Sequence, residues 1–315
     1  MKYQPFIYPA VFGEGRTEMK NEIFKGACTA LITPMNESGA VDYEAFGRLI
    51  DWQIESGIDA LLIAGTTGEG STLSDDEHQE VLRFAFERAA GRVPMIAGTG
   101  SNDTAYAVEL TKAACEIGYD ANLIVTPYYN KATQNGLVKM FQMIADASTK
   151  PLVLYNIAGR TGINIAPSTF AKLKGYRNIA AIKEASGNIS QVADIAALVG
   201  DEMAIYSGND DQIVPILSLG GSGVISVLSN LLPKETSEMC RKFMEGDTKG
   251  ALEMQLKYLP LIHALFSEVN PIPVKAAMAA MGYGADYLRM PLTPMEEEHR
   301  NVLFAEMKKL GLIGE

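Results

Sequence analysis

Residues 59–98, DALLIAGTTGEGSTLSDDEHQEVLRFAFERAAGRVPMIAG, hold one strand, loop, helix and strand in succession. The stretch begins with a short apolar run, 59–65, and ends with another, 93–98. Between them, in 74–91, apolar residues return every three or four positions, which predicts an amphipathic helix. A serine begins this helix and a glycine follows it, as helix boundaries prefer. Two apolar strands separated by a helix predict parallel pairing in a sheet covered by helices.

The same unit recurs along the chain. The apolar runs occupy 27–33, 59–65, 93–98, 122–127, 152–156, 179–185, 203–208 and 221–227. Segment 42–57 is a second clear amphipathic helix, with an aspartate at its start and a glycine at its end. Eight strand–helix units over roughly 200 residues favour an α/β fold of the closed (β/α)8 TIM-barrel type. An open doubly wound sheet, which usually has fewer strands, is the alternative.

The two ends of the chain differ from the repeating part. After the eighth run the chain turns wholly helical, from about Pro233 to Leu310. We therefore expect a barrel over 23–246 and a C-terminal helical domain over 247–315, an appendage that stabilises or oligomerises the barrel. Residues 1–22 show no periodicity and contain several Pro and Gly. We expect a flexible extension, an arm on a neighbour, or an upstream start codon with Met19 as the functional beginning.

The composition limits the classes of function. With 47% hydrophobic and 21% charged residues the chain has a normal globular balance, and its net charge of -11 argues against nucleic acid or an anionic membrane as a partner. Its three cysteines and three histidines follow no metal-ligand spacing, so we expect no metal site and a reduced cytoplasmic location. No apolar run approaches membrane-spanning length, and none near the start forms a signal peptide.

In a (β/α)8 barrel, functional side chains lie where the strands end. The side chains at these positions are Thr66, Thr67, Tyr128, Tyr129, Tyr155, Arg160 and Lys183. Each alone has an ordinary explanation as a turn, a packing residue or a surface charge. Hydroxyls, a guanidinium and an amine at one rim together favour a catalytic site.

Lys183 follows the apolar run 179–182, where an ammonium is expensive unless it is paired or loses its proton. The adjacent Glu184 should point to the opposite face by strand alternation, so it is not the partner. Burial favours a neutral amine, which can attack a ketone and form an imine that acts as an electron sink. Hydroxyl groups such as those of Tyr155, Thr67 and Tyr129 suit the proton transfers, and Arg160 or Gly-rich backbone amides suit a carboxylate.

Six motifs share their order and spacing with a known family: GTTGE, TPYYN, YNIAGRTG, IKEASGN, YSGNDD and GGSGVISV. From about Ile23 to Gly311 the chain resembles the pyruvate-dependent class I aldolases that include dihydrodipicolinate synthase and N-acetylneuraminate lyase, and it is most similar to the synthase branch. The resemblance implies that pyruvate forms a Schiff base on Lys183, becomes an enamine and attacks aspartate semialdehyde. The product, 4-hydroxy-tetrahydrodipicolinate, leads to lysine and diaminopimelate, and no cofactor is implied.

The resemblance also implies roles in proton transfer and assembly. Tyr155 is the proton donor and acceptor, and Thr67 joins it in a hydroxyl relay with Tyr129. We count the neighbouring Thr66 hydroxyl among the catalytic groups as well. In the family the tyrosine matching Tyr129 reaches into the site of the adjacent subunit. A homodimer is therefore the minimum, and a homotetramer, a dimer of dimers, is usual.

Substrate-binding roles follow by position in the same family. Thr66 and Thr67 hold the pyruvate carboxylate, Ile225 contributes a backbone contact, and Gly208 lines the site. Arg160 matches the arginine that binds the semialdehyde carboxylate. Sialic-acid lyases generally lack an arginine there, because their second substrate is a sugar. Two alternatives stay open: an aldolase that cleaves N-acetylneuraminate or a 2-keto-3-deoxy sugar acid, and a non-catalytic barrel used for sensing or assembly.

Family members inhibited by lysine bind it at a subunit interface. Asn102 and Tyr128 match that pattern, whereas Gly70, Asp75 and Tyr106 stand where lysine-sensitive enzymes commonly have serine, histidine and glutamate. Loss of a carboxylate partner for a buried ammonium costs several kcal/mol of binding free energy. We therefore expect weak lysine inhibition or none.

Overall fold

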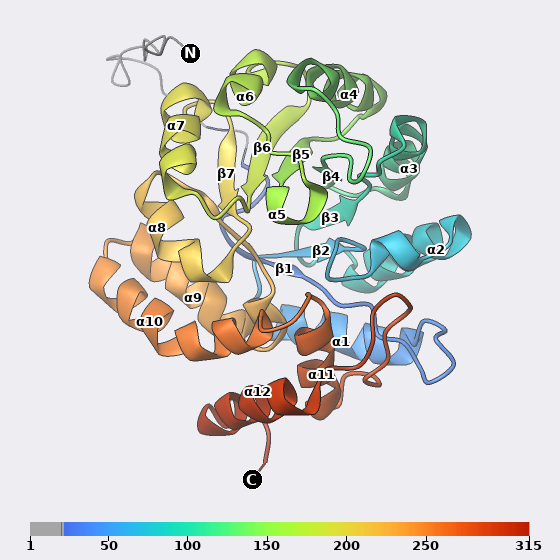
Figure 1. Ribbon diagram of the computed structural model, residues 1–315, viewed down its shortest axis with the longest axis vertical. Coiled ribbons are helices and arrows are strands. Elements are labelled where there is room, and N and C mark those ends of the chain that lie inside the picture. The colour runs from blue at the N-terminus through green and yellow to red at the C-terminus, as the bar shows by residue number, and fades with distance from the viewer. Residues whose placement is uncertain (1–19, 21, 315) are drawn as a thin grey trace.

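A closed ring of eight parallel strands forms the centre of the computed structural model, which describes residues 20 and 22–314 (Figure 1). The strands are β1 Gly26–Ala30, β2 Ala60–Ile63, β3 Met95–Gly98, β4 Ala121–Val125, β5 Leu152–Asn156, β6 Ile179–Glu184, β7 Ala204–Ser207 and β8 Gly223–Ser226. They follow chain order around the ring, and β8 pairs with β1. The predicted (β/α)8 barrel is confirmed, and the closing pair excludes an open sheet.

Helices surround this ring. They are α1 Tyr43–Glu55, α2 Asp75–Ala89, α3 Thr104–Ile117, α4 Gln134–Ala147, α5 Ala158–Thr161, α6 Pro167–Leu173, α7 Ile189–Val199, α8 Ile213–Ser218 and α9 Pro233–Met244. The predicted helix starts are confirmed by capping: the Asp42 side chain accepts from the Ala45 amide, and Ser74 and Glu77 form a reciprocal capping box. Each cap satisfies backbone donors that the first helical turn leaves free.

The barrel interior is filled by small and medium side chains and closed at the end where the strands begin. Phe24, just before β1, stacks on Tyr206 with ring centroids 4.2 Å apart. The Tyr206 hydroxyl donates to the Phe24 carbonyl (2.8 Å) and accepts from its amide (3.2 Å). A plug at this end leaves the opposite end, where the strands finish, as the place for a site.

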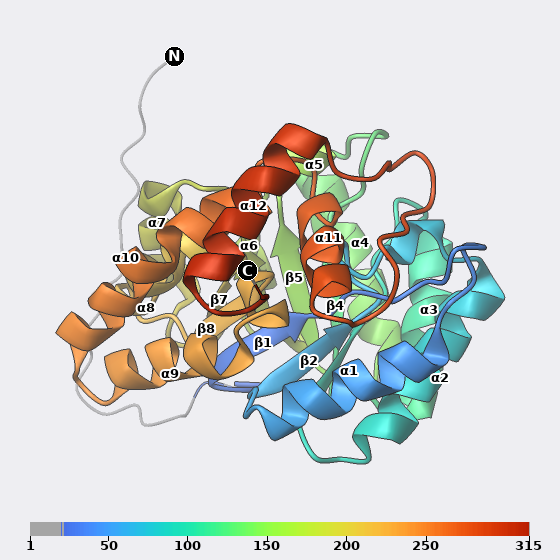
Figure 2. The same ribbon diagram turned by 90° about the horizontal axis from the view of Figure 1, so that it is seen from below.

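Three further helices, α10 Thr248–Leu265, α11 Ile272–Ala280 and α12 Glu297–Lys309, complete the chain. Figures 1 and 2 show α10 beside α9, and α11 between α12 and the barrel. The proposed domain boundary at 246/247 falls between α9 and α10. The proposed extension 1–22 lies outside the described residues except for Lys20 and Glu22. Among the helices of the described part, none is both long and apolar enough to cross a membrane.

Candidate active site

Lys183 lies on β6 inside the barrel, with only 5% of its surface exposed. Its register partner on β5 is Tyr155. The lysine Nζ lies 4.2 Å from the centroid of the tyrosine ring. The enclosed amine and the phenol that the sequence predicts at one rim therefore lie next to each other on neighbouring strands.

Glu184 faces the other side of the sheet, as strand alternation predicts. Its carboxylate accepts hydrogen bonds from the Asn156 side chain (3.0 Å) and the Ser186 amide (2.7 Å). Asn156 and Glu184 are themselves register partners. The carboxylate is thus engaged outside the ring and does not pair with Lys183.

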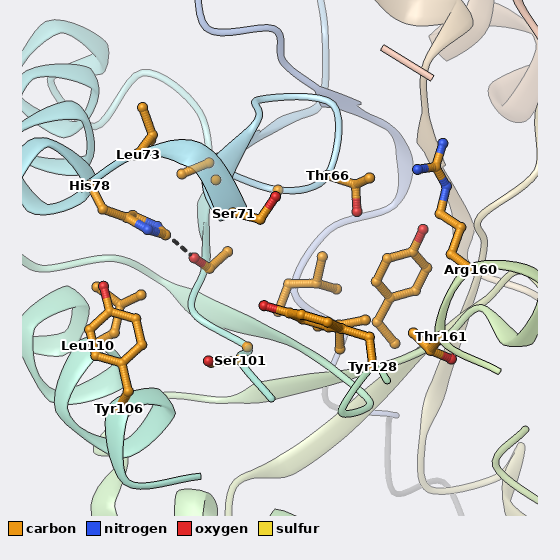
Figure 3. Close-up of a pocket in the computed structure, with 18 of the residues that line it drawn as sticks. Thr66, Ser71, Leu73, His78, Ser101, Tyr106, Leu110, Tyr128, Arg160 and Thr161 are labelled. Carbon is orange, nitrogen blue, oxygen red and sulfur yellow. Dashed lines mark hydrogen bonds between the residues drawn. The ribbon is translucent and has the colours of Figure 1, made fainter. Parts of the chain in front are cut away.

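A cavity of about 390 Å³ opens beside these residues. Its walls include Thr66, Tyr128, Tyr155 and Arg160. Figure 3 shows Thr66 and Arg160 toward one end and Tyr106 toward the other. Tyr155 both lines the cavity and contacts Lys183, which is not itself one of the lining residues.

Thr66 and Thr67 occupy different environments in the loop after β2. Thr66 lines the cavity, whereas Thr67 is only 2% exposed. The Thr67 hydroxyl accepts a hydrogen bond from the Asn270 side chain (3.0 Å). Two residues on, Glu69 adopts a left-handed conformation (φ 54°) and forms a buried ion pair with Lys275 (2.5 Å). The C-terminal helical segment therefore holds this loop at two points.

Arg160 lies in the short helix α5 after β5 and lines the cavity. Its Nη2 donates to the backbone carbonyl of Asn270 (2.8 Å). The guanidinium is held by a neutral acceptor, which leaves its charge available to a carboxylate.

Gly208 lies beside the Lys183 side chain, and Ile225 lies inside the barrel. A Cβ added to Gly208 would lie 2.7 Å from the Ala185 Cβ and 3.2 Å from the Lys183 Cε. Ile225 on β8 is buried in the cluster inside the barrel that also contains Tyr155. Gly208 is thus at the rim of the ring and Ile225 inside it, as the sequence predicts.

Tyr129 does not enter this cavity in the single chain. It has φ 69° and is 94% exposed, whereas its neighbour Tyr128 lines the cavity. Of the predicted catalytic residues in the single chain, Lys183 contacts Tyr155, and Tyr155 and Thr66 line the same cavity.

The far end of the cavity is lined by Gly70, Asp75, His78 and Tyr106. Burial, together with a hydrogen bond to Asp75, raises the pKa of Tyr106 to about 12. Burial also lowers the pKa of His78, whose Nε2 lies 2.9 Å from the Gly98 carbonyl oxygen. This end therefore presents a neutral phenol and a neutral imidazole at neutral pH.

Two buried polar residues were not among the predicted site residues. Asn270 lies in the region after Pro233, for which the sequence predicts only helical structure. Asp210, after β7, is buried and accepts from the Val227 and Leu228 amides (3.0 and 2.8 Å). Burial raises the pKa of its carboxyl. The motif YSGNDD signalled Asp210, but no sequence pattern signalled the contact between Asn270 and Thr67.

Known proteins share both the sequence and the fold. The profile of the family described as "Dihydrodipicolinate synthetase family" matches residues 23–310. The 4-hydroxy-tetrahydrodipicolinate synthase of Lachnoclostridium phytofermentans is 56% identical over 292 residues, 92% of this chain and 99% of that protein. The enzyme of the same name from Caldicellulosiruptor saccharolyticus is 56% identical over 290 residues, 92% of this chain and 98% of that protein.

Solved structures agree with these sequence matches. Dihydrodipicolinate synthase from Aquifex aeolicus superposes with a TM-score of 0.90 at 44% identity, covering 92% of this chain and 99% of that one. The lysine-bound enzyme from Cyanidioschyzon merolae has a TM-score of 0.90 at 41% identity, covering 93% and 100%. The resemblance predicted from the six motifs is confirmed, and the chain belongs to the dihydrodipicolinate synthetase family, lyases of the class I aldolase type.

Proposed function

We propose that this chain condenses pyruvate with aspartate semialdehyde to give 4-hydroxy-tetrahydrodipicolinate. The observation that carries the proposal is the enclosed Lys183 amine beside Tyr155, which lines a cavity together with Thr66 and Arg160. The amine attacks the pyruvate ketone, and loss of water leaves a protonated imine. Loss of a methyl proton gives an enamine, whose carbon attacks the aldehyde. The amino group of the semialdehyde then attacks the imine carbon, closes the ring and releases Lys183.

Proton transfer falls to hydroxyl groups. The Lys183 Nζ lies 4.2 Å from the centre of the Tyr155 ring, and we assign to the Tyr155 hydroxyl the proton transfers at the nitrogen and oxygen of the carbinolamine and at the methyl carbon. Thr66 lines the same cavity, and Thr67 lies next to it in the loop. We assign the relay to Tyr155, these two hydroxyls and Tyr129 of a partner subunit. None of these steps requires a cofactor.

Two anchors separate the two substrates. The pyruvate carboxylate is held by the Thr66 and Thr67 hydroxyls and the backbone around them. Ile225 contributes a backbone contact, and Gly208 lines the site where a Cβ would lie 3.2 Å from the Lys183 Cε. Arg160 binds the carboxylate of the semialdehyde, since a guanidinium matches a carboxylate with two parallel bonds. A sugar-acid substrate would gain little from this arginine.

The proposed assembly is a homotetramer built from two dimers. Tyr129 is 94% exposed at a left-handed backbone position, an unusual environment for a tyrosine. Insertion into the site of a second copy would bury its ring and complete the hydroxyl relay. We place this soluble enzyme in the cytoplasm.

Lysine is proposed to inhibit the enzyme weakly or not at all. The solved enzyme from Cyanidioschyzon merolae has lysine bound. In this chain the far end of the cavity offers a phenol at Tyr106 where lysine-sensitive relatives have a carboxylate. Burial and a hydrogen bond to Asp75 raise the pKa of this phenol to about 12, so Tyr106 carries no negative charge at neutral pH. A lysine ammonium would therefore lack the charged partner that those relatives offer at this position.

Borohydride trapping tests the reaction. The protein is incubated with pyruvate, reduced and weighed intact and after digestion. A pyruvate adduct on Lys183 is expected, and its absence would remove the Schiff-base mechanism. Aspartate semialdehyde is then added, and consumption of pyruvate is followed. Turnover of N-acetylneuraminate or a 2-keto-3-deoxy acid without turnover of the semialdehyde would refute the proposed substrate.

A further inference from the structure

The loop between α10 and α11 reaches the rim of the active site at Asn270, which is only 7% exposed. This residue contacts both proposed carboxylate anchors. Its side-chain Nδ2 donates to the Thr67 hydroxyl (3.0 Å), and its backbone carbonyl accepts from Arg160 (2.8 Å). One residue from the C-terminal helical segment thus connects the loop after β2 with the helix after β5.

The contact with Thr67 determines which way its hydroxyl can point. A threonine hydroxyl has one proton to donate and two lone pairs to accept with, whereas an amide NH2 group only donates. The Asn270 Nδ2 therefore occupies a lone pair of Thr67, and the hydroxyl proton must point elsewhere. A proton directed away from Asn270 is available to an anion, which is what a substrate carboxylate requires.

Asn270 is held firmly relative to this hydroxyl. Five residues on, Lys275 donates to Glu69 (2.5 Å), and both side chains are fully buried. The second oxygen of Glu69 accepts from the Arg289 amide (3.1 Å). Because Glu69 and Thr67 share one loop, the ion pair fixes the distance between that loop and α11. The Asn270 Oδ1 is buried and has no hydrogen-bond partner among the described residues, so the Nδ2 bond to Thr67 is the side-chain hydrogen bond that Asn270 makes there.

We propose that Asn270 is a positioning residue for pyruvate: its side chain orients the Thr67 hydroxyl as a donor to the substrate carboxylate. This inference rests on the proposed function. The backbone carbonyl of the same residue holds Arg160 and does not depend on the side chain. The side chain and the main chain therefore serve different substrates, and they can be separated by mutation.

Asn270→Ala removes the amide and keeps the carbonyl. We expect the half-saturating pyruvate concentration in borohydride trapping, and the pyruvate KM, to rise roughly tenfold, the effect of one hydrogen bond to a charged group. The KM for aspartate semialdehyde should change by less than about twofold, because Arg160 keeps its acceptor, the backbone carbonyl of residue 270. Asn270→Asp, which keeps the volume but can only accept, should weaken pyruvate binding further.

A double-mutant cycle separates positioning from general damage. In a Thr67→Val background the orienting bond has no target, so Asn270→Ala should leave the pyruvate half-saturation unchanged. Asn122→Ala is a matched control, since Asn122 is a buried asparagine on β4 that does not line the cavity. It should lower the thermal unfolding temperature without changing pyruvate half-saturation.

The outcomes are distinguishable. Additive effects in the cycle, or equal rises in both KM values, would overturn the role of Asn270. If Asn270→Ala does not fold, the isosteric Asn270→Asp carries the test, and unchanged pyruvate binding in it would overturn the role. Absence of an adduct in the parent protein would instead refute the proposed function itself.

Discussion

Tyr155 and Lys183 are register partners on adjacent parallel strands, and the lysine Nζ lies 4.2 Å from the centre of the tyrosine ring. The next pair along the same two strands, Asn156 and Glu184, hydrogen-bond to each other on the outer face. The same register therefore directs Tyr155 and Lys183 inward and Asn156 and Glu184 outward. A slip by one residue would exchange the two faces, so the outer bond between Asn156 and Glu184 protects the inner geometry.

Gly208→Ala tests how closely the lysine is confined. The added Cβ would lie 2.7 Å from Ala185 Cβ and 3.2 Å from Lys183 Cε, so Ala185 must shift and the lysine stem must move slightly with it. We expect a large loss of pyruvate adduct in borohydride trapping at saturating pyruvate. Gly136→Ala on α4, where the nearest contact is 3.5 Å, is the control and should trap normally. Full adduct yield in Gly208→Ala would contradict this confinement.

Arg160→Ala should separate the two substrates. The loss of a guanidinium that binds a carboxylate is expected to raise the semialdehyde KM roughly ten- to a hundredfold, by the range for hydrogen bonds to charged groups. The pyruvate KM should change much less. Steady-state kinetics with each substrate varied in turn provide the measurement, and Arg48→Ala, an exposed arginine on α1 paired with Glu44, is the control. Equal effects on both KM values would argue against the assigned role.

Acid stability depends on Glu77, whose bonds from Arg289 lower its pKa to about 2 from an ordinary 4.5. A carboxyl with a lowered pKa stabilises the fold above its ordinary pKa, and this contribution disappears as the pH falls towards 2. Glu77→Gln should therefore be less stable than the parent at neutral pH, and the difference should shrink below an ordinary pKa of 4.5 and close towards pH 2.

Chemical denaturation across this pH range is the measurement. Glu44→Gln, which removes one exposed ion pair with Arg48, should show little difference at any pH. The difference in unfolding free energy between Glu77→Gln and the parent could instead stay constant from about pH 7 to about pH 3. That result would contradict the lowered pKa of Glu77.

The barrel and half of the site could be predicted because they depend on local patterns. Strand alternation placed Lys183 inward and Glu184 outward, and the capping residues marked the helix starts. The end of the first strand was predicted too late, at residue 33. The strand ends at Ala30 because the Ile32 amide leaves the ladder and donates to the Asn230 side chain (3.1 Å).

Contacts between distant segments escaped prediction. Asn270 and Thr67 are 203 positions apart in the chain, and neither belongs to a repeating pattern that pairs them. Segment 270–282 carries a helix signal, which explains its backbone but not the side chain that precedes the helix. The buried pair of Glu69 and Lys275 has the same origin, because only tertiary packing brings α11 onto the loop after β2.

Lysine should leave the activity nearly unchanged at sub-millimolar concentrations. We expect Tyr106, which lines the cavity, to stand where lysine-sensitive relatives have a carboxylate, and its pKa of about 12 leaves the phenol uncharged at neutral pH. The triple variant Gly70→Ser, Asp75→His, Tyr106→Glu restores the residue types of lysine-sensitive relatives and should gain inhibition. Steady-state rates at rising lysine concentration measure both proteins. Half-inhibition of the parent by sub-millimolar lysine would show that this cavity binds lysine by another set of contacts.

Subunit mixing provides a direct test of the exposed Tyr129. Lys183→Ala has no nucleophile, and Tyr129→Phe has no hydroxyl to offer a partner. In a mixed dimer, the subunit with Tyr129→Phe keeps its own Lys183 and receives an intact Tyr129 from its neighbour. Co-expression of the two variants should therefore restore activity in roughly a quarter of all sites, the statistical share for a symmetric dimer. Activity no higher than the sum of the separate variants would mean that Tyr129 serves its own chain or none.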